Sequence, residues 1–332
     1  MSWQIAIDEP KSFALLSPSS MEQALEWASK YGDDAAMLAG GCDLLDKLKN
    51  QWSSPHYVIN LKTIPNLKQI QTSGSSLKIG ALTTLGEIER HAQLRQIAPA
   101  IVKAAARVAT PQIRNMGTVG GNLLQDSRCS YYRGAWECYR KGGIICDAVR
   151  GYNMEHAIFG GDRCYTVTPS DLAPVMLALE ATAKVQSPRG EQQIAFADFF
   201  LLPKDDIRKM HQLATDDILT EVEVPVRANQ RSTFIKYAMR NSWDFALASI
   251  AVAFTQEGST LRNARIVFGG VAPIPWRSQA AEEVIEGKTL TADIIEAAAL
   301  ASVKDAQPLA YNEYKIGLVK KLVRAALTEF LP

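Results

Sequence analysis

Four of the chain's five cysteines fall in one short window that follows a glycine-rich turn. The cysteines are Cys129, Cys138, Cys146 and Cys164, and the turn is Asn-Met-Gly-Thr-Val-Gly-Gly-Asn at residues 115–122. Glycine lets a backbone approach a ligand closely and leaves its N–H groups open to phosphate oxygens. Cysteine thiolates hold iron–sulfur clusters or zinc. Together the two features predict an anionic cofactor beside a metal centre, as in an electron-transfer protein.

The spacing of the four cysteines matches no common short motif. Eight, seven and seventeen residues separate them, unlike the tight spacing of bacterial ferredoxins or the paired C-x₂-C of structural zinc sites. Their clustering favours an iron–sulfur site, with a zinc site or four unrelated buried thiols as the alternatives. Nearby basic side chains would offset thiolate charge and could donate hydrogen bonds to cluster sulfurs; these are Arg128, Arg133, Arg140 and Lys141.

A second glycine pair stands at Gly40 and Gly41, and the fifth cysteine, Cys42, follows it. The apolar run 35–39 predicts a buried strand before the pair, and residues 43–49 predict a helix after it. A glycine turn between a strand and a helix is a natural anion site. Two such turns suit a dinucleotide whose diphosphate is held between two lobes. Neither turn has the Rossmann pattern, and no P-loop sequence occurs.

Other catalytic residue types give no comparable pattern. His56, His91, His156 and His211 are scattered along the chain, and we interpret each as a packed or surface side chain rather than as a ligand or an acid–base group. No G-x-S-x-G elbow or Ser/His/Asp arrangement is evident. The sequence therefore predicts no hydrolytic centre.

Composition limits the possible partners. The 332 residues predict two or three domains. Lys and Arg number 36 against 35 Asp and Glu, so nothing points to nucleic acid or an anionic membrane. No apolar run reaches the roughly 20 residues that cross a bilayer, residues 1–10 do not read as a signal peptide, and five cysteines do not indicate a disulfide scaffold. We expect a cytoplasmic protein without membrane insertion.

Regular elements are predicted around the irregular cysteine region. Ser19 and Glu22 form a capping-box pattern that starts a helix, and Gly32 ends it. Residues 110–169 lack periodicity, and an irregular stretch of this length in a compact protein is usually functional. Further helices are expected at 85–94 and 99–108, and further strands at 56–60, 77–82 and 218–225.

Beyond a turn at 227–230 the chain predicts a separate unit. Residues 245–254 and 261–271 read as a hairpin. The last helix has an apolar face, and Lys315 is expected to lie away from it. The residues of that face are Ile316, Val319, Val323, Ala326, Leu327 and Phe330.

With both turns in view, the chain resembles the FAD-binding subunits of molybdenum hydroxylases, which include xanthine dehydrogenase, carbon monoxide dehydrogenase, aldehyde oxidoreductases and 4-hydroxybenzoyl-CoA reductase. Residues 38–44 look like the family's first flavin motif and residues 113–123 like the second. Residues 169–174, Pro-Ser-Asp-Leu-Ala-Pro, resemble a third stretch, whose aspartate lies against the flavin. Segments 236–244 and 269–273 are similar to the family's C-terminal domain.

The resemblance implies an α+β fold. Residues 1–226 would form a two-lobed FAD-binding domain of the vanillyl-alcohol-oxidase type, with lobes at about 1–60 and 61–226. Residues 231–332 would form a smaller α+β C-terminal domain over the flavin. The residues implied to bind FAD are Leu38, Ala39, Gly40, Gly41, Cys42, Asp43, Leu44, Thr118, Gly120, Gly121, Asn122, Asp171, Leu219 and Lys236.

Within that set the resemblance implies separate roles. The glycine N–H groups of both turns and Asn122 would hold the diphosphate, while Asp171 and Lys236 would lie nearer the ring or the ribityl chain. The family usually has Thr or Ser where Cys42 stands, so a hydroxyl hydrogen bond would be lost there.

The cysteine segment, residues 124–168, looks like the loop that carries a [4Fe-4S] cluster beside the flavin in 4-hydroxybenzoyl-CoA reductase and in certain bacterial aldehyde oxidoreductases. Carried over, the ligands are Cys129, Cys138, Cys146 and Cys164. FAD here would pass on electrons from a small partner with two [2Fe-2S] clusters, and a molybdopterin partner would hydroxylate the substrate. A partner's signal could also carry the folded complex to the periplasm.

The resemblance favours an aldehyde as the substrate of that complex. A hydroxybenzoyl-CoA reductase-like complex and an N-heterocycle dehydrogenase are alternatives within the family. A stand-alone flavin oxidoreductase and a zinc-stabilised scaffold without enzyme activity are the alternatives outside it.

Overall fold

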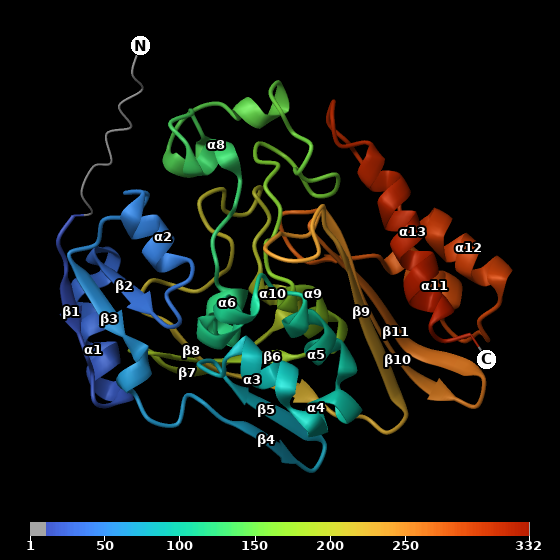
Figure 1. Cartoon of the computed structure of the whole chain (residues 1–332), viewed down its shortest axis with the longest axis horizontal. Helices are drawn as coiled ribbons and strands as arrows, with labels where there is room; N and C mark the ends of the chain where they lie inside the picture. The colour runs from blue at the N-terminus through green and yellow to red at the C-terminus, as the bar shows by residue number, and fades with distance from the viewer. Residues whose placement is uncertain (1–10, 332) are drawn as a thin grey trace.

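The structure, a computed structural model, describes residues 11–331 (Figure 1). The described residues form a three-stranded, a five-stranded and a four-stranded sheet. Figure 1 shows the small sheet at one end of the molecule and the four-stranded sheet, with its covering helices, at the other. The predicted α+β fold is confirmed. The predicted domain limits at residues 1 and 332, and the stretch 1–10 examined for a signal peptide, lie outside the described residues.

The first lobe is a parallel sheet with helices between its strands. Both β1 and β2 pair in parallel with β3. The Ser20 hydroxyl accepts the Gln23 amide at 3.3 Å, and the Gln23 side chain accepts the Ser19 amide at 2.8 Å. The cap therefore closes on Gln23, one residue later than the predicted Ser19–Glu22 pair. The elements are β1 (Ala14–Leu16), α1 (Met21–Tyr31), β2 (Ala35–Leu38), α2 (Leu44–Lys49) and β3 (Tyr57–Asn60).

The second lobe is an antiparallel sheet in the order β4-β5-β8-β6-β7, packed against helices around one hydrophobic core. Its strands are β4 (Ile70–Ser73), β5 (Ser76–Gly80), β6 (Thr182–Ser187), β7 (Gly190–Ala195) and β8 (Ile218–Pro225). Its helices are α3 (Leu85–Arg90), α4 (Ala92–Ile97), α5 (Pro99–Ala106), α9 (Leu172–Ala178) and α10 (Phe196–Phe199). The single helix expected at 85–94 breaks at His91, which ends α3 and caps α4.

The second glycine turn lies between two short helices, α6 (Pro111–Met116) and α7 (Val119–Leu123). The cysteine segment follows and is irregular, as predicted, with α8 (Ser130–Arg133) as its α-helix. In Figure 1 this segment arches away from the sheets, above α6 and between α2 and α13. Contacts with neighbouring elements, rather than a sheet or a core of its own, must therefore hold it in place.

The C-terminal part is an antiparallel sheet in the order β12-β11-β10-β9, with a second hydrophobic core beneath its helices. The predicted hairpin is confirmed as β10 paired with β11. The strands are β9 (Gln230–Tyr237), β10 (Ala248–Glu257), β11 (Thr260–Gly269) and β12 (Trp276–Arg277). The helices are α11 (Gln279–Ile285), α12 (Ala292–Ala301) and α13 (Tyr314–Thr328).

Lys315 contradicts the prediction for the last helix, because its side chain is completely buried. Its ammonium donates to the carbonyl oxygens of Glu155, at 2.9 Å, and Gly270, at 2.7 Å. Lys315 thus ties the C-terminal helix to the end of the cysteine segment. Across residues 11–331, no helix is long and apolar enough to span a membrane.

Candidate functional site

The two glycine turns lie against each other. A Cβ at Gly40 would sit 2.0 Å from the carbonyl oxygen of Met116, and a Cβ at Gly117 would sit 3.8 Å from the Cys42 sulfur. Position 40 therefore admits only glycine without pushing the turns apart. Two turns that are distant in the sequence form one continuous feature, as a shared diphosphate site would require.

The amides of the two turns differ in what they bind. Gly120 donates its N–H to the Ala81 carbonyl oxygen at 2.8 Å, and Gly121 donates to the Thr118 hydroxyl at 3.0 Å. Within residues 11–331 the amides of residues 40–42 make no hydrogen bond. The first turn therefore offers the open donors that a phosphate needs. The amides of the second turn would have to share or break their present bonds to act as predicted.

Asn122 connects the second glycine turn to α9. Its Oδ1 accepts a hydrogen bond from the Ser170 hydroxyl at 2.7 Å and from the Leu172 amide at 3.3 Å. Its Nδ2 has no partner among the described residues, so the donor end of this amide is available to an acceptor. The structure thus brings two of the predicted flavin segments together.

Asp171 and Lys236 form a buried ion pair, with Oδ2 and Nζ 2.6 Å apart. Lys236 also donates to the carbonyl oxygen of Arg107 at 3.1 Å. Burial raises the pKa of Asp171 above its ordinary value, and the ammonium of Lys236 opposes that rise. The resemblance placed both side chains near the flavin ring or the ribityl chain, and the structure brings them into direct contact between α9 and β9.

The other predicted flavin residues differ in exposure. Leu219 is 4% exposed within β8 and packs in the second-lobe core. Leu38 ends β2, and the carbonyl oxygen of Ala39 accepts a hydrogen bond from Lys62 Nζ at 3.0 Å. Leu44 begins α2 beside the first turn. Their contacts with FAD stay predictions.

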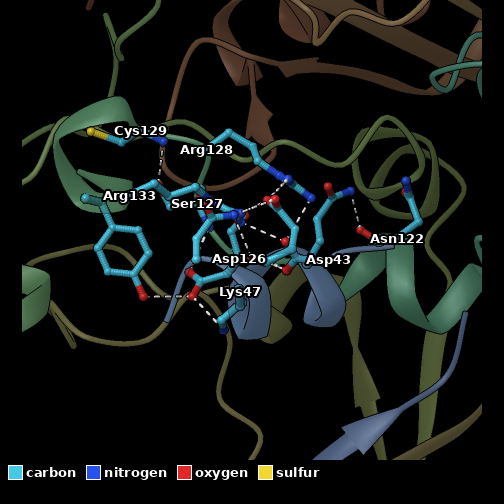
Figure 2. Close-up of polar contacts among 12 residues, drawn as sticks. Asp43, Lys47, Asn122, Asp126, Ser127, Arg128, Cys129 and Arg133 are labelled. Atoms are coloured by element: carbon cyan, nitrogen blue, oxygen red, sulfur yellow. Dashed lines mark hydrogen bonds and ion pairs between the residues drawn. The ribbon is translucent and has the colours of Figure 1, made fainter. Parts of the chain in front are cut away.

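Asp43 binds the cysteine segment (Figure 2). One of its carboxylate oxygens pairs with Arg128 at 2.8 Å and with Arg133 at 2.7 Å. The other oxygen accepts the amide of Asp126 at 2.9 Å. The residue that directly follows the first glycine turn is therefore anchored to the residues on both sides of Cys129.

Asp46, one turn further along α2, completes this contact. Arg133 reaches it at 2.8 Å and also lies over the ring of Trp52 at 5.1 Å. We call Asp43, Asp46, Arg128 and Arg133 the α2 clamp. We predicted that basic residues near the cysteines would offset thiolate charge and could donate hydrogen bonds to cluster sulfurs. Arg128 and Arg133 bind the clamp carboxylates instead. Lys141 likewise donates to the Gly134 carbonyl oxygen at 2.7 Å.

Asp126 is a second anchor beside the clamp. Its carboxylate meets Lys47 at 3.1 Å, Arg140 at 3.1 Å and the Tyr132 hydroxyl at 2.8 Å. Burial acts to raise the pKa of Asp126, but the two cations and the hydroxyl outweigh it and lower this pKa to about 2. Asp126 is therefore ionised at every physiological pH, and it links α2 to the cysteine segment.

All four clustered cysteines line one small cavity of about 10 Å³. Cys138 and Cys146 face each other across an antiparallel bridge. Burial raises the thiol pKa of Cys129 and Cys146, and it raises that of Cys164 to about 12. Within residues 11–331, no three His, Cys, Asp or Glu side chains form a group that could hold a metal ion.

His156 also lines this cavity, and sequence reasoning missed it. Its Nε2 lies 3.2 Å from the Cys129 sulfur, while its buried Nδ1 has no partner among the described residues. Burial, with help from the nearby Lys315 ammonium, lowers the pKa of His156 to about 4. Its position inside the cysteine window was the available signal. Arg140 lines the cavity too, and its charge favours the Cys164 thiolate, as predicted.

Family models match nearly all of the described chain. Residues 11–227 match the FAD binding domain in molybdopterin dehydrogenase. Residues 233–330 match the CO dehydrogenase flavoprotein C-terminal domain.

Individual proteins are similar over the same span. The aldehyde oxidoreductase FAD-binding subunit PaoB of Escherichia coli is 30% identical, with 89% of this chain and 91% of that protein covered. The nicotinate dehydrogenase FAD-subunit of Eubacterium barkeri is 29% identical, with 86% of this chain and 84% of that protein covered. A solved carbon monoxide dehydrogenase from Hydrogenophaga pseudoflava matches with a TM-score of 0.75 and 26% identity, over 96% of this chain and 97% of that chain.

An FAD-binding domain followed by a flavoprotein C-terminal domain places this chain in the class of FAD-binding oxidoreductase proteins. Within that class, the chain belongs to the FAD-binding medium subunits of the molybdenum hydroxylase family. The predicted family, fold and oxidoreductase class are confirmed. The likeness to the 4-hydroxybenzoyl-CoA reductase subgroup, with its extra cluster, stays a prediction.

Proposed function

We propose that this chain carries electrons on FAD within a molybdopterin-dependent dehydrogenase complex, between [2Fe-2S] clusters of a small subunit and an external acceptor. The contact between the two glycine turns, with open amides at residues 40–42, is the observation that supports this most directly. Bound FAD would supply the redox chemistry, and the chain would supply binding, orientation and charge.

The residues of the chain divide the work of holding FAD. The open amides of residues 40–42 and the free Nδ2 of Asn122 would donate to diphosphate oxygens. Asp171 and Lys236 would meet the ring or the ribityl chain as a pair whose two charges offset each other. Because that pair joins α9 to β9, it would also fix the C-terminal domain over the cofactor.

We also propose that Cys129, Cys138, Cys146 and Cys164 hold a [4Fe-4S] cluster. All four line one cavity, and backbone amides of Tyr132, Ala148 and Thr166 favour the thiolates of three of them. A single zinc ion draws four ligands onto one centre, whereas a four-iron cube binds each thiolate at a different corner.

The experiment that tests the flavin site compares two glycine variants of the purified complex. Gly40→Ala places a methyl group 2.0 Å from the Met116 carbonyl oxygen, whereas Gly317→Ala, in α13, meets nothing within 4 Å. We expect Gly40→Ala to lose at least 90% of its bound FAD, because the turns must separate, and Gly317→Ala to keep it all. Full FAD occupancy in Gly40→Ala would contradict the proposed site.

We propose an aldehyde as the substrate of the complex, because the relative at 30% identity is an aldehyde oxidoreductase subunit. The nicotinate dehydrogenase subunit at 29% identity makes an N-heterocycle the competing class. Turnover of aromatic and aliphatic aldehydes, compared with nicotinate, by the purified complex separates the two. Turnover of nicotinate alone would overturn the aldehyde assignment.

A further inference from the structure

His156 is the one side chain among the described residues whose nitrogen lies within hydrogen-bonding distance of a clustered cysteine sulfur. The distance from Nε2 to Cys129 Sγ is 3.2 Å, and both residues line the same cavity. Backbone contacts fix the residue on both sides: its amide donates to the Asn153 carbonyl oxygen at 3.0 Å, and its carbonyl accepts from Asn312 Nδ2 at 3.0 Å. The direction of the ring toward Cys129 is therefore built into the fold.

The position of the ring proton follows from the same contacts. A proton on Nε2 has the Cys129 sulfur as its acceptor at 3.2 Å, and a thiolate that binds a cluster would have no proton to give the ring in return. The geometry therefore favours the tautomer in which Nε2 carries the proton and donates it to sulfur.

We propose that His156 is a positioning residue for the cluster. The His156 side chain donates a hydrogen bond to the Cys129 thiolate and so raises the reduction potential of the [4Fe-4S] centre. This inference rests on the proposed cluster. One-electron reduction adds one negative charge to the iron and sulfur atoms, and a donor at sulfur stabilises the reduced form more than the oxidised form. Backbone amides meet the sulfurs of Cys129, Cys146 and Cys164. A side-chain substitution cannot remove those amides, whereas it can remove the His156 donor.

The test uses two variants in the intact complex. His156→Leu removes the donor, and His156→Gln keeps an N–H at an equivalent distance from the backbone. Metal and flavin analysis first establishes whether each variant retains the wild-type iron and FAD. Dithionite titration followed by electron paramagnetic resonance then gives the potential of the cluster.

We expect both variants to retain the cluster. In His156→Leu the reduced-to-oxidised ratio at a fixed potential should fall about tenfold, equivalent to about 59 mV for one electron. In His156→Gln the potential should stay near that of the wild type. Wild-type potentials in both variants would overturn the inference while leaving the cluster itself intact. Absence of iron from these cysteines in the wild-type protein would instead refute the cluster, and the inference with it.

A second measurement separates a hydrogen-bond donor from an iron ligand, and it does not depend on the stability of the leucine variant. In wild-type protein labelled with ¹⁵N-histidine, pulsed resonance of the reduced cluster should show a weak nitrogen coupling that disappears in His156→Gln. A strong coupling, with retention of the cluster in Cys129→Ser, would make His156 a ligand and contradict the proposal. No nitrogen coupling at all would also contradict it.

Discussion

The C-terminal domain and the cysteine segment are held in place by different forces. The C-terminal sheet and its helices enclose a continuous apolar core that includes Ile250, Phe268 and Val323. The cysteine segment has no separate core: Ile158 and Phe159 near its end pack into the C-terminal core. The α2 clamp, Asp126 and Lys315 bind the rest of it through charged groups. Apolar burial is non-directional, whereas buried charges depend on specific partners. The fold supports the first region by itself, and the second region depends on a few contacts and on its proposed cluster.

The largest loss of stability is expected from a substitution that creates a cavity in the C-terminal core. Phe268→Ala removes a fully buried ring and should lower the free energy of unfolding by about 3–5 kcal/mol. Leu300→Ala, at a half-exposed position on α12, should change it by less than about 0.5 kcal/mol. Urea denaturation followed by fluorescence measures both variants. Equal effects would mean that the apolar core does not support this domain.

A smaller and more local effect is expected from the clamp. Arg133→Met leaves Asp43 and Asp46 without their closest cation and should lower the local opening free energy of the cysteine segment by about 2–3 kcal/mol. Hydrogen exchange resolved by peptide measures this effect for residues 124–168.

The matched control lies in the C-terminal domain. Arg324 pairs with Glu296 at 2.7 Å, but both side chains are well exposed, so Arg324→Met should change exchange by no more than about 1 kcal/mol. Two results would contradict the distinction between the two regions. One is faster exchange of residues 124–168 in the Arg324→Met control, and the other is no increase in their exchange in Arg133→Met.

The smallest effect is a pH dependence near the cysteine segment. Burial lowers the pKa of His211 from 6.5 to about 4, against the attraction of Asp126. The unfolded chain therefore binds a proton that the folded chain does not between pH 6.5 and 4, and stability falls as the pH falls through that range. The slope from this group is at most about 1.4 kcal/mol per pH unit.

His211→Phe should remove that part of the slope, because the new ring can pack on Phe199 without titrating. Urea midpoints measured at pH 7.0, 5.5 and 4.5 give the comparison. An unchanged slope in the variant would show that His211 is not the group responsible.

The same contrast explains what the sequence could predict. The hairpin of β10 and β11 was predicted because its apolar residues are contiguous and its turn is local. The glycine turns and the cysteines were found because residue type and spacing carry their chemistry. Lys315 and the clamp arginines were misjudged because their partners are distant in the sequence. The missed hairpin of β6 and β7 has a polar, exposed second strand without an apolar pattern.

Local ambiguity accounts for the smaller errors. Ser19 and Ser20 can both cap a helix, and either Glu22 or Gln23 can close the box, so the boundary moved by one residue. His156 was interpreted as an isolated histidine although it lies inside the cysteine window, because only the folded segment brings its ring to Cys129. Its proposed role depends on tertiary contacts, and no short sequence pattern encodes them.

The central claim is that a flavin site and a four-iron site lie side by side in this chain, and one quantitation tests it directly. Iron, zinc, acid-labile sulfide and FAD are measured in the wild-type complex, in Cys138→Ser and in the control Cys42→Ser, whose sulfur lies outside the cysteine cavity. The account predicts full FAD in all three, and four fewer iron atoms per chain in Cys138→Ser alone. Equal iron in all three proteins, or zinc in place of the missing iron, would contradict it.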